Sequence, residues 1–562
     1  MDFVLTLHSH LPYVLNHGRW PHGSDWLCEA AIDTYLPLLE RLNELAAEGT
    51  AAPVTIGVTP VLASQLASPV FVHELEAYFE QRLTSCDEAP VSLRSTGDSG
   101  LLHLVDYWRS RLLRLREVFH RLDRNIPGAL RRLEAADRLE IISSAATHGF
   151  LPLLARDESI RLQLAVGRGE HRRLFGRSPV GCWLPECAYR SRGEWNPMPG
   201  APYSGIRRGI EEHLADAGYQ YFFTDAHMAQ AGLPVGASGE LLAPGHEFSH
   251  ERHDLVPSRG PHSPYRPYRV APVRSTGTVT AFVRDPLSSL QVWSRHQGYP
   301  GDEWYLEFHK IRWPGGLKLW RVSGPGTDLG EKQPYDPAQA MDRVSAHAAH
   351  FAWLLSEISR DPAAGRGGCV VAPFDTELFG HWWYEGPDFL AAVFRELRQR
   401  PALHPSTAGQ YLAASPARSS LRLGQGSWGA NGDFSMWLNE ATAWTWRRLW
   451  PLEQAFWDAA PAGLANPAAR PVLAQAAREL LLAQSSDWQF IISTGAVADY
   501  AERRFLQHCE DAERLITALT APDGSGLEEG RNRGEALARR DDLFPDILAS
   551  VEQALSGSRA LA

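Results

Sequence analysis

Seven short apolar segments, each followed by polar residues, recur along the first two thirds of the chain. They cover residues 3–7, 54–58, 139–143, 180–184, 221–223, 278–283 and 369–374. Between most of them lie stretches with apolar residues at three- and four-residue spacing, at 29–47, 157–175, 210–217 and 338–359. Strands that alternate with helices build parallel sheets. We therefore predict an α/β fold in which seven strand–helix units close into a TIM-like barrel.

The barrel, which we place at residues 1–410, contains two intervals that are too long for simple crossovers. Residues 60–135 hold amphipathic helical patterns and predict a helical insertion. Residues 229–277 are rich in Gly, Pro, His and Ser. A loop of this length is usually functional or disordered, so we expect a lid over the active site, with a merely variable loop as the alternative.

Beyond residue 410 the alternation of strands and helices stops. A glycine-rich stretch at 424–431 is followed by long helical patterns. We predict that residues 411–525 form a C-terminal helical domain that completes the substrate cleft. Residues 526–562 are rich in charges, Gly and Ser and predict a mobile tail with a frayed helix.

Composition excludes several classes of partner. The net charge of -11 argues against nucleic acid, because neutralising phosphates requires a basic face. The N-terminus has no basic region of the kind that opens a signal peptide, and no run of about 18 apolar residues occurs. The six cysteines are scattered without a CxxC pair, which is typical of reduced thiols. We expect a cytoplasmic protein that is a monomer or a weak homo-oligomer.

The polar residues that follow the predicted strands form one set. The carboxyl ends of parallel strands meet at one edge of a barrel, so these side chains should converge. They combine carboxylates, imidazoles and one guanidinium, which predicts a functional site. The set is His8, His10, Thr59, Thr147, His148, Glu186, Asp225, His227, Arg284, Asp285 and Asp375.

Two carboxylates in this set indicate a reaction. Glu186 lies beside Trp183 and Pro185, and Asp375 precedes a cluster of aromatic residues. Either could instead be an acid that caps a helix. As a pair they fit glycoside cleavage, in which one carboxyl group attacks the anomeric carbon and the other protonates the departing oxygen. Retention of configuration requires carboxyl groups about 5–5.5 Å apart.

Two readings from other classes remain open at this stage. His8, His10, His148, His227 and Asp375 fit a metal-dependent barrel hydrolase, which often begins with His-x-His after its first strand. The aromatic residues and Arg284 at the same edge suit a sugar pocket better than a metal cage. A non-catalytic glucan-binding protein would need the same aromatic residues but not the acids.

Several tryptophans lie in sequence contexts that suit ligand stacking. Trp293 and Trp304 flank the glycines of the segment 290–304, and Trp428 lies in the glycine-rich stretch. A glycine-flanked Trp packs less tightly than one in a helix, so we predict that Trp428 is exposed. Trp488, between two predicted helices, is as consistent with an interdomain core.

Five stretches together resemble glycoside hydrolase family 57, and in particular its 1,4-α-glucan branching enzymes. The likeness runs in order from His8 to about residue 519. The stretches are HSHLPY (8–13), SSAATHGFLPLL (143–154), GCWLPECAY (181–189), PFDTELFGHWWYEG (373–386) and SSDWQF (485–490).

The resemblance implies an incomplete (β/α)7 barrel and a retaining double displacement on α-glucans without a metal or another cofactor. It implies Glu186 as nucleophile and Asp375 as general acid/base. An α-amylase or a 4-α-glucanotransferase of the same family is the alternative. The residues that resemble the family's substrate contacts and pocket lining are Arg284, Gly301, Trp428, Asp487, His10, His148 and Trp293.

One feature departs from the family pattern. Branching enzymes of this kind resemble one another in carrying a tyrosine on a mobile loop after the fifth strand. The corresponding part of this chain, GLPVGASGELLAPG, has no tyrosine. Tyr265 or Tyr268 could take the role, or no residue does.

Overall fold

The computed structural model describes residues 1–202, 205–232, 261–270, 277–293, 298–324, 326–362, 364–365 and 367–559. Seven parallel strands within these ranges form the centre of the molecule. They correspond one to one with the seven apolar segments of the sequence. The strands are β1 (Asp2–Ser9), β2 (Val54–Val58), β3 (Leu139–Ser144), β4 (Gly181–Trp183), β7 (Tyr221–Thr224), β9 (Val279–Val283) and β10 (Cys369–Asp375).

The sheet is a curled, incomplete barrel, as predicted. Its parallel strands lie in the order β10-β1-β2-β3-β4-β7-β9. In the described part of the chain β9 and β10 form no ladder, but the Asp285 amide donates to the carbonyl of Val371 at 2.8 Å. On its other side β9 pairs antiparallel with β8 (Tyr268–Val270), which pairs in turn with β12 (Ser420–Leu421).

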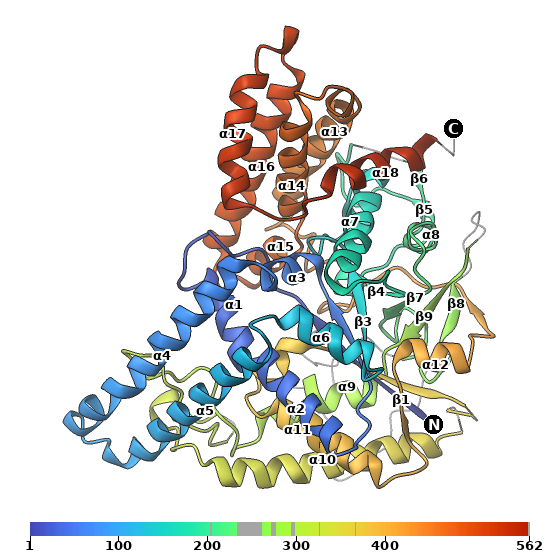
Figure 1. The fold of residues 1–562 in the computed structure, drawn as a ribbon. Coiled ribbons are helices and arrows are strands. Elements are labelled where there is room, and N and C mark those ends of the chain that lie inside the picture. The colour runs from blue at the N-terminus through green and yellow to red at the C-terminus, as the bar shows by residue number, and fades with distance from the viewer. Residues whose placement is uncertain are drawn as a thin grey trace.

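These strands are buried on both faces, which explains why their sequences are continuous apolar runs. Every residue of β2, β7 and β9 is buried, since helices cover the outside of the sheet and side chains fill its inside. The covering helices surround the sheet in Figure 1. They are α2 (Leu36–Ala47), α3 (Pro60–Leu66), α6 (Ile126–Ala135), α7 (Asp157–Phe175), α8 (Ile210–Asp216), α9 (Pro286–Trp293), α10 (Pro337–Arg360), α11 (Gly386–Arg398) and α12 (Ala408–Ala414).

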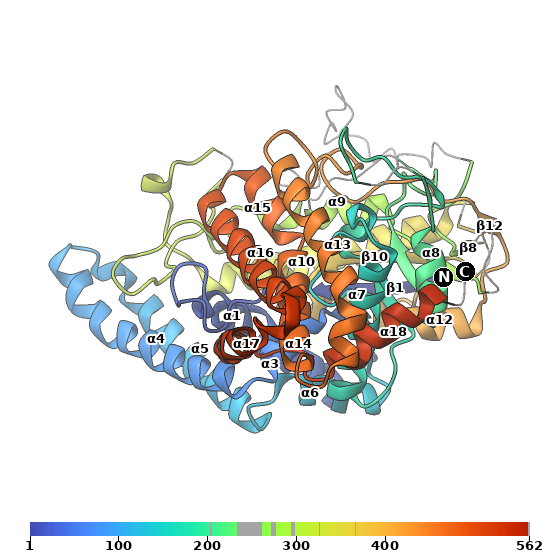
Figure 2. The ribbon, with the colours of Figure 1, turned by 90° about the horizontal axis from the view of Figure 1, so that it is seen from above.

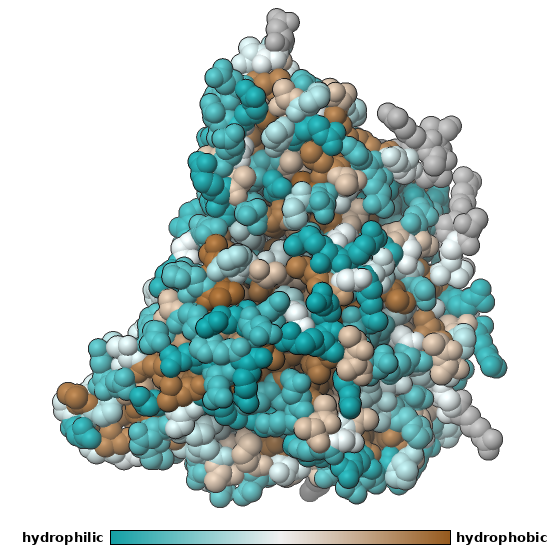
Figure 3. All heavy atoms as spheres, viewed as in Figure 1, coloured by the Kyte–Doolittle hydropathy of each residue, from teal (hydrophilic) through white to brown (hydrophobic). Residues whose placement is uncertain are grey.

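A helical arm extends from one side of the barrel. Its helices α4 (Pro69–Ser95) and α5 (Leu102–Arg121) lie against each other and project outward in both ribbon views (Figures 1 and 2). The surface in Figure 3 is mostly hydrophilic, with small hydrophobic patches scattered over it, some of them on this arm. The arm lies within the interval for which we predicted a helical insertion.

Helices follow the barrel in the C-terminal part of the chain. They pack on one another above the barrel in Figure 1, and α18 packs against α7. They are α13 (Ala443–Ala465), α14 (Arg470–Ala483), α15 (Asp487–Thr494), α16 (Ala498–Thr520), α17 (Leu527–Arg540) and α18 (Ile547–Arg559).

The last of these helices differ from the mobile tail that we predicted for residues 526–562. Here α17 packs against α14 and α16, and the α17–α18 connection buries Leu543 and Phe544. The charges that indicated mobility lie largely on the exposed face of α17. Its glycines Gly530 and Gly534 are buried, and a Cβ atom at Gly530 would come within 2.7 Å of Ala518, so this glycine allows close packing on α16.

A buried ionic network joins the loop after β1 to the helical domain. Asp541 accepts from His17 at 2.6 Å and pairs with Arg540 at 2.7 Å. On α16, His508 bonds to Glu479 at 2.8 Å, and Arg504 donates to the carbonyl of Tyr13 at 2.7 Å. Because buried charges are costly to separate from their partners, these contacts fix the domain's position on the barrel.

The predicted lid at 229–277 falls mostly outside the described residues. The segment 261–270 is described, and it settles the position of both tyrosines proposed for the lid. The carbonyl of Tyr265 accepts from the amide of Cys369, at the end of β10 opposite Asp375. At about 3.3 Å per residue, that end lies about 20 Å from Asp375. Tyr268 is buried and bonds to Ser263, so neither tyrosine is placed to serve the reaction centre.

Candidate active site

Asp375 ends β10 and stands beside the first histidine of the chain. In the parallel register of β1 and β10, Asp375 is the partner of His8. Two residues later Glu377 turns back and accepts hydrogen bonds from the amide of His10 at 3.2 Å and from the Tyr35 hydroxyl at 2.5 Å. The described part of the chain provides no hydrogen bond to the Asp375 carboxyl group, which leaves it available to a ligand.

Glu186 lies on a sharp turn after β4. Its backbone has φ 59° and ψ 23°, a left-handed conformation that non-glycine residues seldom adopt. His148, after β3, also has a positive φ of 58°. Such conformations cost of order 1–3 kcal/mol each and persist where the surroundings fix them, which is common at active sites.

Trp428 holds the Glu186 carboxylate in place. The indole N–H of Trp428 donates to Glu186 Oε2 at 2.9 Å, and the Trp428 amide donates to the Glu186 carbonyl at 3.0 Å. Tyr189 and Gly426 form an antiparallel bridge that fixes the two segments together. The prediction that Trp428 is exposed is therefore wrong. The residue is only 4% exposed. A Cβ atom at Gly426 or Gly429 would lie within 2.7 Å of Gly432 or Trp437, so these glycines allow the loop to fold tightly around Trp428.

The imidazoles form a stack on the other side of Glu186. The rings of His10 and His148 lie 4.0 Å apart, and the ring of His8 stacks on Trp183 at 4.7 Å. His8 Nε2 and His148 Nε2 share a hydrogen bond of 3.0 Å. Burial lowers the pKa of both His8 and His148 well below the ordinary value, so these two rings are neutral.

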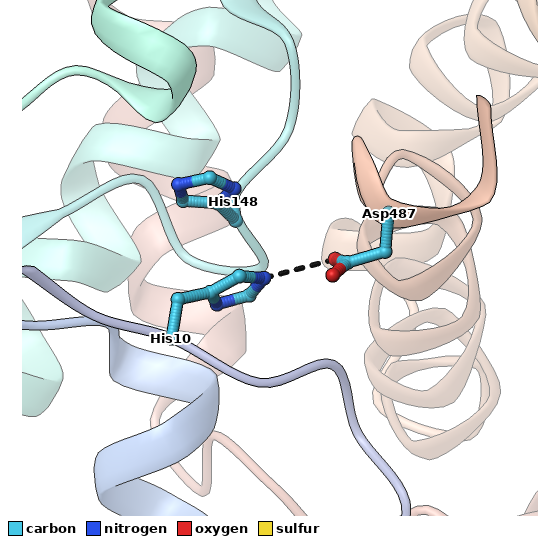
Figure 4. Close-up of side chains that lie close together, drawn as sticks. All are labelled: His10, His148 and Asp487. Atoms are coloured by element: carbon cyan, nitrogen blue, oxygen red, sulfur yellow. Dashed lines mark hydrogen bonds and ion pairs between the residues drawn. The ribbon is translucent and has the colours of Figure 1, made fainter. Parts of the chain in front are cut away.

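The C-terminal domain supplies two of the polar groups. Asp487, at the start of α15, accepts from His10 Nε2 at 2.9 Å, as Figure 4 shows. The Ser486 hydroxyl lies 3.0 Å from His148 Nδ1 and 3.4 Å from Glu186 Oε1. Asp487 was predicted from the sequence, whereas Ser486 was not, although it lies in the same stretch. The site therefore combines groups from the barrel and from the helical domain.

Arg284 and Trp293 close the side of the site toward β9. Arg284 is 1% exposed, pairs with Asp225 at 3.3 Å, and lies 5.6 Å above the ring of Trp428. Trp293, the last residue of α9, contacts Trp428 edge-on at 6.0 Å. Its indole N–H has no partner in the described part of the chain and can donate to a ligand.

Gly301 stands apart from the other predicted residues. It lies on an exposed turn, Tyr299–Gly301, whose neighbour Asp302 pairs with Arg343 of α10. Within the described ranges, no hydrogen bond or ring contact joins it to the cluster around Glu186. The other predicted residues are connected to that cluster through contacts of the kind described above or through shared charge interactions.

Burial and neighbouring charges together set the pKa values of the acids in the site. Burial raises the pKa of Glu186 to about 7; the Trp428 hydrogen bond opposes this, and the charges of Asp375 and Asp487 add to it. Burial raises the pKa of Asp375 to about 8; the charge of Glu377 adds to it and Arg284 opposes it. Burial would also raise the pKa of Asp487, but its interactions with His10 hold it at about 2. Glu186 and Asp375 therefore both titrate near neutral pH, whereas Asp487 is ionised there.

The same cluster has the residue types of a metal site. Ligand atoms of His10, His148 and Asp487 lie within 4.8 Å of one another. However, the stacked rings of the two histidines are inclined by only 19°, so their nitrogen lone pairs run nearly parallel rather than toward one point. All four nitrogens already have protein partners. His227, a further candidate ligand, bonds to the carbonyl of Gly432 at 2.8 Å. The arrangement favours hydrogen bonding over metal binding.

Two buried carboxyl groups among tryptophans at the carboxyl edge of a (β/α) barrel are the arrangement expected of a barrel protein of the glycoside hydrolase class. A family model described as glycosyl hydrolase family 57 matches residues 4–420. A second, described as the C-terminal part of 1,4-alpha-glucan branching enzymes, matches residues 453–551. The chain belongs to glycosyl hydrolase family 57.

Similar proteins cover nearly the whole chain. It is 39% identical over 552 residues to a 1,4-alpha-glucan branching enzyme of Thermococcus kodakarensis, covering 97% of this chain and 77% of that relative. It matches the crystal structure of a branching enzyme from Pyrococcus horikoshii with 36% identity and a TM-score of 0.84, covering 98% and 96% of the two chains. An α-amylase of Thermotoga maritima matches with 28% identity and a TM-score of 0.78, covering 98% of each chain.

No helix in the described ranges is long and apolar enough to cross a membrane.

Proposed function

We propose that this protein is a 1,4-α-glucan branching enzyme. It cleaves an α-1,4 linkage and transfers the released chain to a 6-hydroxyl group, which creates an α-1,6 branch. The observation that carries the proposal is that the likeness to branching enzymes includes both the barrel and the C-terminal helical domain. Ser486 and Asp487 support it, because that domain contributes directly to the site.

The proposed first step uses both carboxyl groups. Glu186, ionised and held by Trp428, attacks C1 of a glucosyl unit while protonated Asp375 gives its proton to the leaving oxygen. The result is a glycosyl ester on Glu186 and a free 4-hydroxyl group on the leaving chain. Both pKa values are raised toward neutral pH, where one carboxyl group can be ionised while the other is protonated, as these roles require.

The second step decides between transfer and hydrolysis. Asp375, now ionised, takes the proton of the acceptor hydroxyl as it attacks C1, and the Glu186 carboxylate leaves. A sugar 6-hydroxyl gives a branch, and water gives hydrolysis, so exclusion of water favours transfer. We propose that His10, His148, Trp293, Arg284, Trp428, Asp487 and Gly301 bind or line the path of the glucan.

The finer assignments belong to the same proposal. We place the reaction in glycogen biosynthesis in the cytoplasm. We also propose a catalytic barrel at residues 1–410 and a helical domain at 411–525 that completes the cleft, followed by the two helices α17 and α18. An α-amylase remains the second candidate, because the Thermotoga maritima match extends over the whole chain.

The product formed from amylose tests the function. We expect new α-1,6 linkages, seen as a fall in iodine staining and as chains released by a debranching enzyme, with few new reducing ends. If reducing ends rise one for one with cleavage and debranching releases nothing, the protein is an amylase instead.

The pH dependence of kcat/KM should be bell-shaped. Glu186 must be ionised, so activity rises as the pH increases through about 7. Asp375 must be protonated, so activity falls as the pH increases through about 8. Initial rates on a maltooligosaccharide between pH 5 and 10 measure both limbs. A profile that stays flat from pH 5 to pH 10 would contradict these assignments.

Trp428→Phe should lower kcat/KM and move the acidic limb to higher pH. The variant keeps an aromatic ring but removes the indole N–H that stabilises the Glu186 carboxylate at 2.9 Å. A hydrogen bond to a charged group contributes about 1.5–3 kcal/mol, so we expect a loss of about ten- to a hundredfold. Trp457→Phe, whose indole N–H bonds to Ser159 away from the site, is the matched control.

A further inference from the structure

Three tryptophans are exposed on loops that lead away from the catalytic strands. Trp20, Trp313 and Trp382 are 70%, 64% and 59% exposed. Most large hydrophobic side chains of this protein are buried, and exposed tryptophan is costly to leave in water. A row of such side chains indicates a binding surface. We call these three residues the tryptophan row.

The members of the row are held in pairs with other aromatic rings. Trp20 and Trp313 lie edge-to-face at 6.1 Å. Trp382 stacks on Phe308 at 5.3 Å with planes inclined by 14°, which leaves its outer face open. Phe308 and Trp313 are five residues apart in one segment, so their Cα atoms are at most about 18 Å apart. The row therefore offers several flat surfaces over a distance that a chain of sugar units can span.

Two members of the row lie on loops that follow strands of the candidate active site. Trp382 follows Asp375 on the loop that leaves β10, and its amide donates to the carbonyl of Glu377 at 3.1 Å. Trp20 lies on the loop that leaves β1 and carries His10. These strands are neighbours in the sheet. Trp313 belongs to the segment 298–324, which lies beside the helical arm, where Arg82 of α4 donates to the carbonyls of Gly315 and Gly316 at 2.7 Å.

Charged groups border the rings. Lys318 lies 4.9 Å above Phe308 and 3.5 Å from Asp33, and Arg312 pairs with Asp98 at 3.2 Å. An apolar protein partner would remove these charges from water at a cost. A polyhydroxylated chain instead offers hydroxyl groups to the charges and its C–H faces to the rings. The chemistry of the border therefore favours a glucan.

We propose that Trp20, Trp313 and Trp382 form a platform that holds an α-1,4-glucan chain outside the reaction centre. The platform anchors long chains so that their cleavable linkages reach Glu186 and Asp375. Short oligosaccharides that occupy only the reaction centre do not reach the platform, so it does not increase their affinity. This inference rests on the proposed function for its choice of ligand, and it adds a site away from the two carboxyl groups.

The experiment compares Trp313→Ala and the double variant Trp313→Ala/Trp382→Ala with the unchanged protein. Binding to glycogen is measured by affinity electrophoresis, and steady-state rates are measured on amylose and on maltotetraose. We expect the dissociation constant for glycogen and the KM for amylose to rise about three- to tenfold for the single variant and further for the double variant. The kcat on amylose and both parameters on maltotetraose should not change.

Trp353→Ala is the matched control, because Trp353 is 37% exposed on α10, on the outside of the barrel. Unchanged glycogen binding in the double variant would overturn the proposal. So would a loss of self-association in that variant by sedimentation equilibrium, which would make the row an interface between copies. If the unchanged protein binds glycogen through the row but forms no α-1,6 linkage, the proposed branching activity is wrong, whereas the proposal of a glucan-binding platform is supported.

Discussion

Glu186→Gln should abolish both transfer and hydrolysis. Glutamine keeps the shape of the side chain and can still contact Trp428, but it cannot form the glycosyl ester. Loss of a covalent nucleophile lowers kcat on the order of 10⁴-fold or more. The measurement is the rate of amylose conversion, followed by iodine staining and by reducing ends.

The control for this variant is Glu194→Gln, an exposed glutamate eight residues further along the chain. It should retain full activity. Normal thermal unfolding of Glu186→Gln would show that the loss is chemical and not a failure to fold. If a well-folded Glu186→Gln protein still forms branches, Glu186 is not the nucleophile.

Asp375→Asn should have a large effect that depends on the leaving group. Asparagine cannot protonate the departing oxygen, and a general acid contributes on the order of 10²–10⁴ to the rate. A maltosyl fluoride needs no such proton, because fluoride leaves unaided. We therefore expect cleavage of amylose to fall by that factor while the ester on Glu186 still forms from the fluoride.

Two further results complete this test. Accumulated ester should turn over faster when azide is added, since azide needs no general base and gives a maltosyl azide of retained configuration. Asp342→Asn, an exposed aspartate on α10, is the control and should behave as the unchanged protein. Equal losses on amylose and on the fluoride would contradict the general acid role.

The sequence predicted the framework of the site because that framework follows from local patterns. Buried parallel strands read as apolar runs, and the residues after them converge at one edge. His10, His148, Glu186, Arg284 and Asp375 were all identified in this way. The same reasoning does not extend to groups that reach the site from another domain without a strand to mark them.

Trp428 and Ser486 illustrate this limit. The glycines around Trp428 suggested an exposed ring, whereas they allow the loop to fold tightly on itself while Trp428 bonds to Glu186. Ser486 donates toward Glu186 only because the start of α15 docks on the loop after β3, where the Ser486 amide bonds to the carbonyl of His148 at 3.2 Å. Both contacts depend on tertiary packing, which the spacing of residues along the sequence does not predict.

The prediction of a mobile tail at the C-terminus differs from the structure for another reason. Local composition over 526–562 predicted a mobile tail, but α17 and α18 are held by contacts with helices distant in sequence. Arg540 and Asp541, at the end of α17, connect to His17 after β1. Charged residues that pair in the folded state cannot be distinguished by composition from charged residues that face solvent.

The most direct test of the account is to identify the residue that carries the glycosyl group. The Asp375→Asn protein is incubated with maltosyl fluoride, digested, and analysed by mass spectrometry. We predict a maltosyl adduct on the peptide that contains Glu186, at the carboxyl group of that residue. An adduct on another residue, or a product of inverted configuration without any adduct, would contradict the assignment of Glu186 and Asp375.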